Sequence, residues 1–153
     1  MEDLYDHKSQ LSALMKSQRF AVLSTNQGDR HPYANLVAFC TSEDLRHVIF
    51  CTLRSTKKFK NIVNNPRIAM LIDNRCNDET DFERASAVTI LGSCGEIQGE
   101  ERSELTSLFI ERHKAMAEFV NFPDCALMKV NVRTYYLVTR FQNVIEIGVK
   151  GLI

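Results

Sequence analysis

Short apolar segments separated by polar turns run through most of the chain, a pattern typical of a mainly β protein. Runs rich in apolar residues predict strands at 19–25, 33–39, 47–52, 67–73, 85–97, 126–140 and 143–147. Apolar residues at helical spacing predict helices at 3–17 and 100–113, and a short helix at 57–64 ends before Asn65-Pro66. The polar stretch 74–84 is predicted to be a loop.

The lengths of the connections indicate how these strands pair. The first three strands follow one another too closely for a parallel crossover, so we expect an antiparallel meander. Gly92 and Gly95 lie inside a long predicted strand and indicate a bend, a bulge or a close backbone approach there. About six strands with few helices favour a small antiparallel barrel covered by helices. The 153 residues suit one domain over 1–153.

Composition narrows the classes of partner. The chain has 19 basic and 19 acidic residues, which argues against binding to nucleic acid or to an anionic membrane. No apolar run approaches the roughly 20 residues that span a bilayer, and the acidic segment 1–6 has no hydrophobic signal character. Five scattered cysteines form no CxxC motif, so we predict no metal site, no disulfide framework and a reducing, cytoplasmic location: Cys40, Cys51, Cys76, Cys94 and Cys125.

Basic residues gather where the short helix 57–64 begins, namely Arg54, Lys57, Lys58 and Lys60. Ser55 or Thr56 is placed to cap that helix. The first turn of a helix is its positive pole, so each added cation costs roughly 0.3–1 kcal/mol unless an anion compensates. Hydroxyls, free N–H groups and two ammonium groups suit a phosphate. The alternative interpretation is a solvated, lysine-rich face.

The order of motifs along the chain resembles the FMN-binding signature of the pyridoxamine-phosphate oxidase superfamily. In that signature a strand ends in aromatic-aromatic-Thr, and Ser/Thr-Arg/Lys-Lys, a short helix and Asn-Pro follow. The counterparts here are Phe50-Cys51-Thr52, Thr56-Lys57-Lys58 and Asn65-Pro66. Further matches lie upstream and downstream, so that the resemblance covers about 19–147: Gly28, Pro32-Tyr33, Leu36-Val37 and Val88–Gly92.

This resemblance implies a six-stranded antiparallel split barrel with flanking helices, which forms a homodimer and binds FMN between the subunits. The FMN phosphate would be held by Ser55, Thr56, Lys57 and Lys58. The flavin ring would be lined, largely through backbone groups, by Asn35, Leu36, Val37, Cys51 and Thr52. The family places residues that reach the partner's flavin near a turn at 140–142, so Arg140 and Gln142 join the predicted cofactor site.

The chain departs from the vitamin B6 oxidase where that enzyme binds its substrate. Asn35 and Cys40 replace a basic residue and a lysine, and only Arg140 remains of an Arg-x-His-x-Arg motif. We interpret Arg112 as an exposed helix arginine and His113 as a favourable charge at a helix end. Too few cations remain for a pyridoxine phosphate, so we expect a relative of the oxidase that uses another small-molecule substrate.

Three functions follow from this reading. The first is an FMN-dependent oxidoreductase that takes electrons from a nicotinamide nucleotide and reduces a small acceptor. No residue is identified as its catalytic acid or base. The second is a flavin- or haem-binding protein that carries, stores or senses its cofactor. The third is a cofactor-free barrel that acts through protein contacts.

Overall fold

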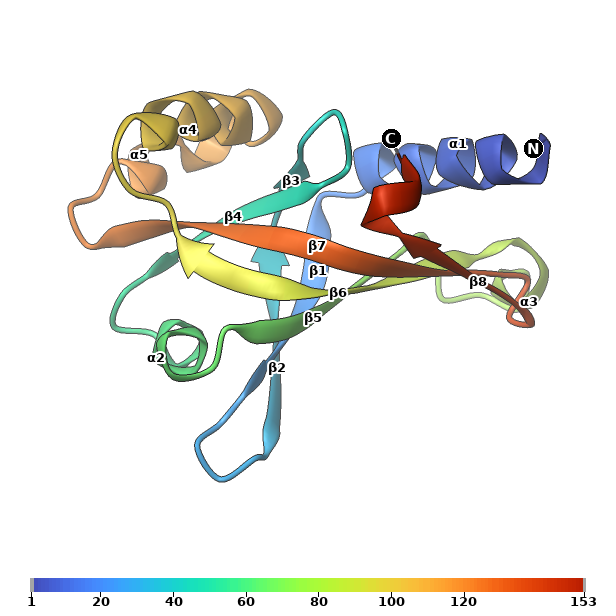
Figure 1. Ribbon diagram of the computed structural model, residues 1–153, viewed down its shortest axis with the longest axis horizontal. Coiled ribbons are helices and arrows are strands. Elements are labelled where there is room, and N and C mark those ends of the chain that lie inside the picture. Colours follow the sequence, from blue (N-terminus) through green and yellow to red (C-terminus); the bar gives the residue numbers. More distant parts are fainter. Residues whose placement is uncertain (1, 153) are drawn as a thin grey trace.

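The computed structural model describes residues 2–152, which form one curled antiparallel sheet flanked by helices (Figure 1). Its strands are β1 (Phe20–Asn26), β2 (Pro32–Ala38), β3 (Cys40–Thr41), β4 (His47–Leu53), β5 (Arg67–Asp73), β6 (Ser86–Glu96), β7 (Cys125–Thr139) and β8 (Asn143–Gly148). Its main helices are α1 (Glu2–Ser17), α2 (Lys57–Asn64) and α4 (Glu100–Arg112). Each predicted strand and helix is present, with bounds that shift by at most one residue at either end.

Strand pairing differs from the predicted meander. The order in the sheet is β2-β1-β5-β6-β7-β4-β3, and β8 pairs with β7. β2 pairs antiparallel with β1, as predicted, but it does not pair with β4; β4 pairs antiparallel with β3, which continues the strand beyond Phe39. The meander prediction therefore holds in strand direction and is wrong for the direct pairing of β2 with β4.

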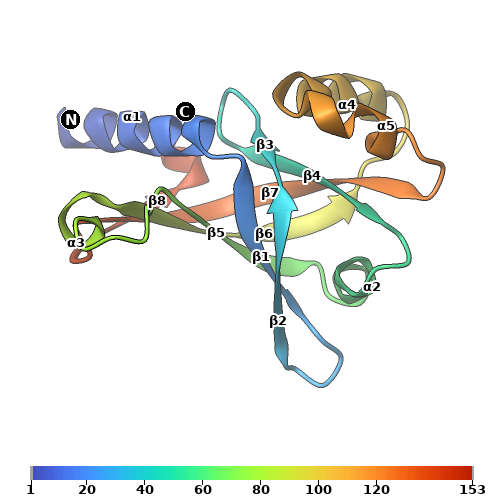
Figure 2. The same cartoon turned by 180° about the vertical axis from the view of Figure 1, so that it is seen from behind.

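The chain changes its pairing partner at Phe39. β2 ends at Ala38 and pairs with β1, whereas β3 begins at Cys40 and pairs with β4. One bent segment therefore joins the two ends of the sheet, and the barrel is split where β2 diverges from β4 (Figure 2).

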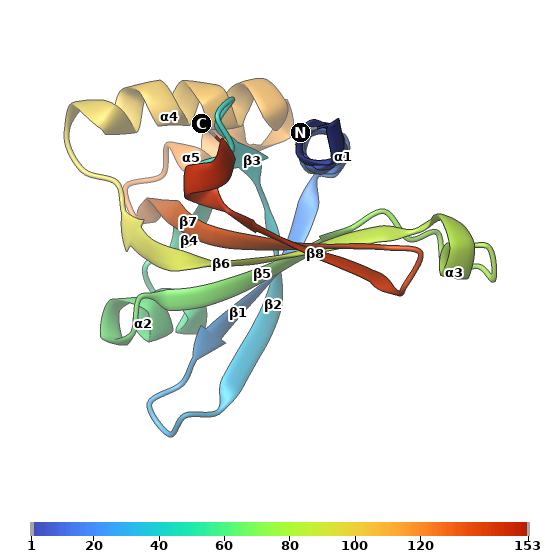
Figure 3. The ribbon, with the colours of Figure 1, turned by 45° about the vertical axis from the view of Figure 1, so that its right-hand side comes forward.

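Two apolar clusters hold the helices against the sheet. The larger fills the barrel and includes Leu11, Leu14 and Met15 of α1, which lies along one side of the strands (Figure 3). The smaller lies on the other face of β4, where Ile49 of the strand and Phe109 of α4 are completely buried, together with Val120 of the short α5 (Ala117–Val120). β4 is therefore buried on both faces. No helix within residues 2–152 is long and apolar enough to cross a membrane.

The segment 74–84 is more ordered than a loop. It contains the short helix α3 (Asp81–Arg84), which the polar sequence did not predict. The carboxylate of Asp81 accepts hydrogen bonds from the backbone N–H groups of Cys76, Asn77 and Asp78. These bonds, that of Cys76 first, lower the pKa of Asp81. Hydrogen bonding, rather than apolar periodicity, organises this segment. Two 3-10 turns and α5 also lacked a sequence signal: Lys114–Met116 and Val149–Leu152.

Two residues join the end of α4 to the barrel, and the predicted role of one of them, Arg112, is wrong. Arg112 donates hydrogen bonds to the carbonyl oxygens of Lys16 and Gln18, so it is engaged at the end of α1 and is not a free surface arginine. His113 is buried, and its Nε2 donates to the carbonyl oxygen of Phe39 at 2.6 Å. His113 is the C-cap of α4, at the helix end as predicted, and its hydrogen bond to Phe39 also ties α4 to the bent strand.

Gly92 is required by a close backbone approach. The pairing of β6 with β7 shifts register between Leu91 and Gly92, and a Cβ at Gly92 would collide with the carbonyl oxygen of Asn131. We predict that Gly92→Ala lowers the free energy of unfolding by about 1–3 kcal/mol, because backbone must move to admit the methyl group. Chemical denaturation measures this difference.

Gly95→Ala is the matched control. Gly95 lies in the same strand, and nothing comes within 4 Å of a Cβ built there. Gly95→Ala should leave the stability unchanged or raise it slightly. Equal losses in the two variants would show that strand propensity, and not the close approach at Gly92, sets the cost.

Candidate cofactor-binding site

Thr56 joins the end of β4 to the start of α2. It is the N-cap of α2, and its Oγ1 accepts a hydrogen bond from the backbone N–H of Phe59 at 3.4 Å. The same oxygen lies 2.8 Å from Oγ1 of Thr52 and 2.9 Å from the carbonyl oxygen of Leu53. Ser55 is exposed beside it. Of the two predicted caps, Thr56 is the one that the helix uses, and it fixes where the first turn of α2 points.

Lys57 and Lys58 follow at this positive helix end. Lys57 is exposed, and its ammonium lies 5.1 Å from the ring centroid of Tyr33 on β2. Lys58 is half-buried, and burial lowers its pKa although the nearby Cys51 acts in the opposite direction. The first turn of α2 has no acidic residue, and the ion pairs found within residues 2–152 involve neither lysine. The two cations are thus uncompensated by protein carboxylates.

Arg54 lies beside Lys57 and Lys58 in the sequence, and we predicted that it joins them as a cation at the helix start. It is not an uncompensated cation, so the prediction is wrong for Arg54. Its guanidinium forms a two-pronged ion pair with Glu96 on β6, with N–O distances of 2.9 and 3.2 Å. It also donates to the carbonyl oxygen of Pro123. The hydrogen bond to Glu96 raises the pKa of Arg54. Arg54 therefore anchors the β4–α2 turn to β6, and Lys60 is an exposed residue further along α2.

The predicted ring-lining residues lie on β2 and β4 with different exposures. Leu36 is 70% exposed on the outside of the barrel, whereas Val37 is in the core. Cys51 and Thr52 are buried, Cys51 in the cluster beneath α4 and Thr52 against Thr56. Side chains of Val37 and Cys51 are thus committed to packing. Any contact that these two residues make with a ligand would use their backbone groups.

Asn35 is the exception on β2, because its Oδ1 is buried and has no hydrogen-bond partner within the described chain. Such an orphaned acceptor is costly, by about 1–3 kcal/mol, and marks a place where a donor is missing. β2 also has a free edge, since it pairs with β1 on one side only. Its unpaired backbone groups offer further hydrogen bonds along that edge.

These features together fit FMN. The contact between Lys57 and Tyr33 brings the start of α2 next to β2, two residues from Asn35 on the same side of the strand. A phosphate would neutralise the charge of the two lysines. After a rotation of the Asn35 amide, a hydroxyl or N–H group of FMN could donate a hydrogen bond to its unpaired Oδ1. When bound, FMN would supply two-electron redox chemistry.

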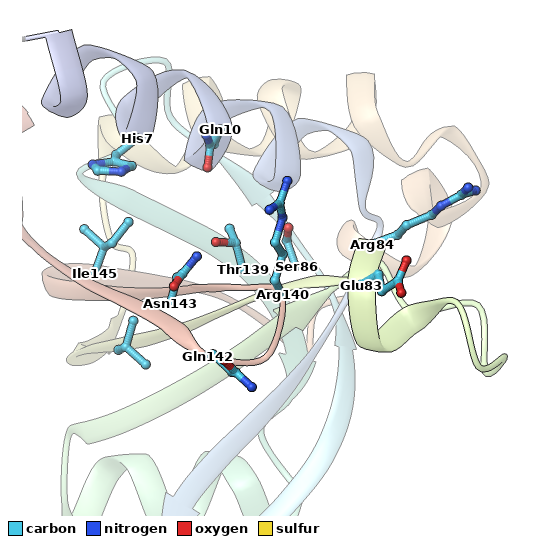
Figure 4. Close-up of a pocket in the computed structure, with 11 residues that line it drawn as sticks. His7, Gln10, Glu83, Arg84, Ser86, Thr139, Arg140, Gln142, Asn143 and Ile145 are labelled. Carbon is cyan, nitrogen blue, oxygen red and sulfur yellow. The ribbon is translucent and has the colours of Figure 1, made fainter.

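Arg140 and Gln142 do not meet this site within one chain. They lie at the β7–β8 turn, at the opposite end of the sheet from α2 (Figure 1). Both line an open hollow of about 770 Å³ between α1, α3 and this turn. The side chain of Arg140 rises into the hollow, and that of Gln142 points away from it (Figure 4). The hollow had no signal in the sequence, because three distant segments form it.

The cysteines form no metal centre. Cys76 is exposed and the other four are buried. Burial raises the pKa of Cys40, Cys51 and Cys94 to about 12, so these thiols stay protonated near neutral pH. Within residues 2–152 no group of three or more His, Cys, Asp or Glu side chains is arranged to hold a metal ion.

The curled sheet closed by one bent strand defines the class of protein as a split barrel. The family model of pyridoxamine 5'-phosphate oxidase matches residues 8–139, and the chain belongs to this family. The family and the fold predicted from the ordered motifs are both confirmed. A comparison of the sequence with curated proteins finds no match.

Solved structures share this fold at low sequence identity. The heme binding protein of Mycobacterium smegmatis has a TM-score of 0.84 and 14% identity over 95% of this chain and 59% of that chain. The chain thus spans about three fifths of that protein. General Stress Protein 26 of Bacillus anthracis has a TM-score of 0.71 and 21% identity over 92% of this chain and 97% of that chain. A putative pyridoxamine 5'-phosphate oxidase of Listeria innocua has a TM-score of 0.68 and 16% identity, over 86% and 97%.

The cap of α2 can be tested by mutation. We predict that Thr56→Ala lowers the free energy of unfolding by about 1 kcal/mol, because the N-cap hydrogen bond and the contact with Thr52 are lost. Ser55→Ala should leave it unchanged, and Thr56→Ser should restore it. Urea denaturation of the three variants decides which hydroxyl caps the helix. A loss in Ser55→Ala alone would reverse the assignment.

Proposed function

We propose that this protein binds FMN, with the phosphate at the start of α2. The observation that carries the proposal is the pair Lys57 and Lys58, two cations at the positive end of a capped helix that form no ion pair with a carboxylate of residues 2–152. Burial already disfavours the charge on Lys58. A dianionic phosphate would offset both the cost of burying the Lys58 ammonium and the repulsion between the two ammonium groups at the positive helix end. Ser55 and Thr56 would add hydroxyl and N–H donors.

The flavin ring would then extend into the split between β2 and β4. Thr52, one residue before the end of β4, lies next to the phosphate site, and the free edge of β2 lies across the split. Backbone groups of Leu36, Val37 and Cys51 would meet the polar rim of the ring, and Asn35 would accept a hydrogen bond from a donor on the cofactor. This arrangement orients the cofactor through main-chain geometry, which the barrel holds rigid.

A homodimer would complete this site. Leu36, Val22 and Leu71 are direct cross-strand neighbours on β2, β1 and β5, and they form an apolar row on the outside of the barrel. Leu36 is 70% exposed and Leu71 is 37% exposed. A contiguous exposed apolar row across a sheet is typical of an interface. A second copy packed on this row would enclose the ring, and Arg140 or Gln142 could reach the partner's cofactor.

The proposed activity is oxidation of a nicotinamide nucleotide and reduction of a small acceptor. The protein would contribute binding, orientation and exclusion of water. Cys40 and Cys51 are protonated and buried, so neither serves as a nucleophile.

A haem-binding carrier is the second candidate, favoured by the fold shared with the mycobacterial heme binding protein. His113 is buried and its Nε2 is hydrogen-bonded to Phe39, so only its Nδ1 could act as an axial ligand without loss of that bond. The absorption spectrum separates the candidates: flavin bands support FMN and a Soret band supports haem. Anaerobic bleaching of the flavin bands by NADH or NADPH, followed by turnover with an acceptor, supports the oxidoreductase. Bound flavin that neither nucleotide reduces supports the carrier.

The phosphate assignment is tested by the double variant Lys57→Ala/Lys58→Ala. We predict that its Kd for FMN, measured by quenching of flavin fluorescence, rises at least tenfold, or about 1.4 kcal/mol, because both ammonium groups are lost. Lys60→Ala is the control on the same helix and should bind FMN normally. Riboflavin has no phosphate, so its affinity should hardly change in the double variant. Unchanged FMN affinity would remove the phosphate from this site.

The dimer is tested by Leu36→Glu. We predict a shift from dimer to the 17.5 kDa monomer in sedimentation analysis, because an unpaired carboxylate in an apolar interface costs several kcal/mol. Phe122→Glu is the control, since Phe122 is 48% exposed but lies after α5, away from the apolar row. A monomeric wild-type protein, or a dimeric Leu36→Glu variant, would contradict the proposed interface.

A further inference from the structure

A groove crosses the outer face of the sheet, away from the β7–β8 turn. Residues of β1, β5, β6 and β7 line it, and the start of β2 borders it where the β1–β2 hairpin projects beyond the other strands (Figure 1). Its volume of about 450 Å³ is that of a small-molecule site. Pro32 of β2 lines the groove, whereas the neighbouring Tyr33 points to the other face of β2 and contacts Lys57. The groove and the proposed phosphate site of FMN therefore lie on opposite faces of this strand.

The groove is positively charged. Arg67 on β5 and Arg133 on β7 line it, both are exposed, and neither takes part in an ion pair found within residues 2–152. The described residues that line the groove include no aspartate or glutamate. Ser24, Ser93 and Asn131 add hydroxyl and amide groups, which can donate to an oxyanion. This combination favours an anionic ligand.

A β-bulge in β7 directs Arg133 into the groove. The pairing of β6 with β7 shifts register between Leu91 and Gly92, and Arg133 is left without a partner on β6. Val132 and Tyr135 both lie in the barrel core, three residues apart where a regular strand would have two. The extra residue is accommodated on the outer face, where Arg133 is exposed. Bulges of this kind occur beside binding sites, where they re-aim a side chain.

Arg67 reaches the groove from the other side of β6. It pairs with Ser93, which in turn pairs with Asn131, so a polar row runs across β5, β6 and β7. Arg133 follows two residues after Asn131 on the same outer face. The strands that carry the two arginines are separated by one strand and are thus about 10 Å apart. Side chains as long as those of arginine can converge on one phosphate group across this span.

We propose that this groove binds a mononucleotide, with its phosphate group between Arg67 and Arg133. Guanidinium groups bind phosphate through paired hydrogen bonds and also stack on planar rings. Ala69, Leu91 and Gly92 give the groove an apolar strip that has no side chain at Gly92, so a flat base can lie close to the sheet. The serine hydroxyls would contact the ribose. This site goes beyond the proposed binding of FMN and does not rest on it.

Calorimetric titration of the full chain with adenosine monophosphate (AMP) tests the site. We expect saturable binding and a loss of at least tenfold in affinity in Arg133→Gln and in Arg67→Gln. Adenosine, which has no phosphate, should also bind at least tenfold more weakly. Arg84→Gln is the matched control, because Arg84 is also exposed and in none of the ion pairs found within residues 2–152, but lines the hollow at the β7–β8 turn. Absence of AMP binding, or equal affinities in the wild type and Arg133→Gln, overturns the proposal.

Three further measurements locate the bound AMP. Lys57→Ala/Lys58→Ala should bind AMP as the wild type does; a loss there would place the phosphate at α2 and overturn the proposal. In the amide NMR spectrum AMP should shift the signals of Ser24, Ala69 and Ser93, and Arg133→Gln should keep the wild-type pattern elsewhere, which verifies its fold.

The third measurement concerns the proposed dimer, since the groove adjoins the apolar row of its interface: Ser24 and Ala69 lie two residues from Val22 and Leu71 on the same strands. Leu36→Glu should bind AMP with the affinity of the wild type. Binding by this variant alone would show that a second copy covers the groove, and would overturn the proposal. A protein that binds AMP but no flavin would remove the FMN proposal and leave this one standing.

Discussion

The fold depends on how the chain passes through Phe39. This residue is completely buried, its N–H donates to the carbonyl oxygen of Arg19, and its carbonyl oxygen accepts from His113. Both backbone groups are therefore satisfied at the position where the strand leaves β1 for β4. The bend closes the sheet on itself and also opens the split between β2 and β4. The candidate cofactor site lies at that split, so the same constraint produces the barrel and the place for a ligand.

The neighbouring strand β6 decides which of the cations at the start of α2 has a carboxylate partner. Glu96 on β6 forms an ion pair with Arg54 and anchors the turn, while Lys57 and Lys58 have no carboxylate partner in the part of the chain that the structure describes. A helix end with two uncompensated ammonium groups is electrostatically unfavourable alone and favourable with a bound dianion. The energetic deficit of the protein without ligand, together with the orphaned oxygen of Asn35, is the physical basis for the affinity that we infer.

Local patterns were sufficient for most elements and for the family. The helix 57–64 and the strand 67–73 have the predicted bounds, because Thr56 caps the helix and Asn65-Pro66 ends it. The same local motifs indicated the family that the match over residues 8–139 establishes. The helix at Asp81–Arg84 was missed because a carboxylate bound to backbone N–H groups stabilises it, and no apolar periodicity accompanies such a contact.

The sequence by itself determined most of the elements, the family and the position of the lysines at a helix start, since each depends on residues close together in the chain. Only the tertiary structure decided which partners these elements take. It paired Arg54 with Glu96, away from Lys57 and Lys58. It placed Arg112 and His113 in hydrogen bonds that hold the end of α4 against the barrel. It also bent the second predicted strand at Phe39, so that this strand pairs with β1 before the bend and with β4 after it. It also brought α1, α3 and the β7–β8 turn around one polar hollow. Such pairings depend on packing and hydrogen bonds between distant segments, which leave no periodic mark along the chain.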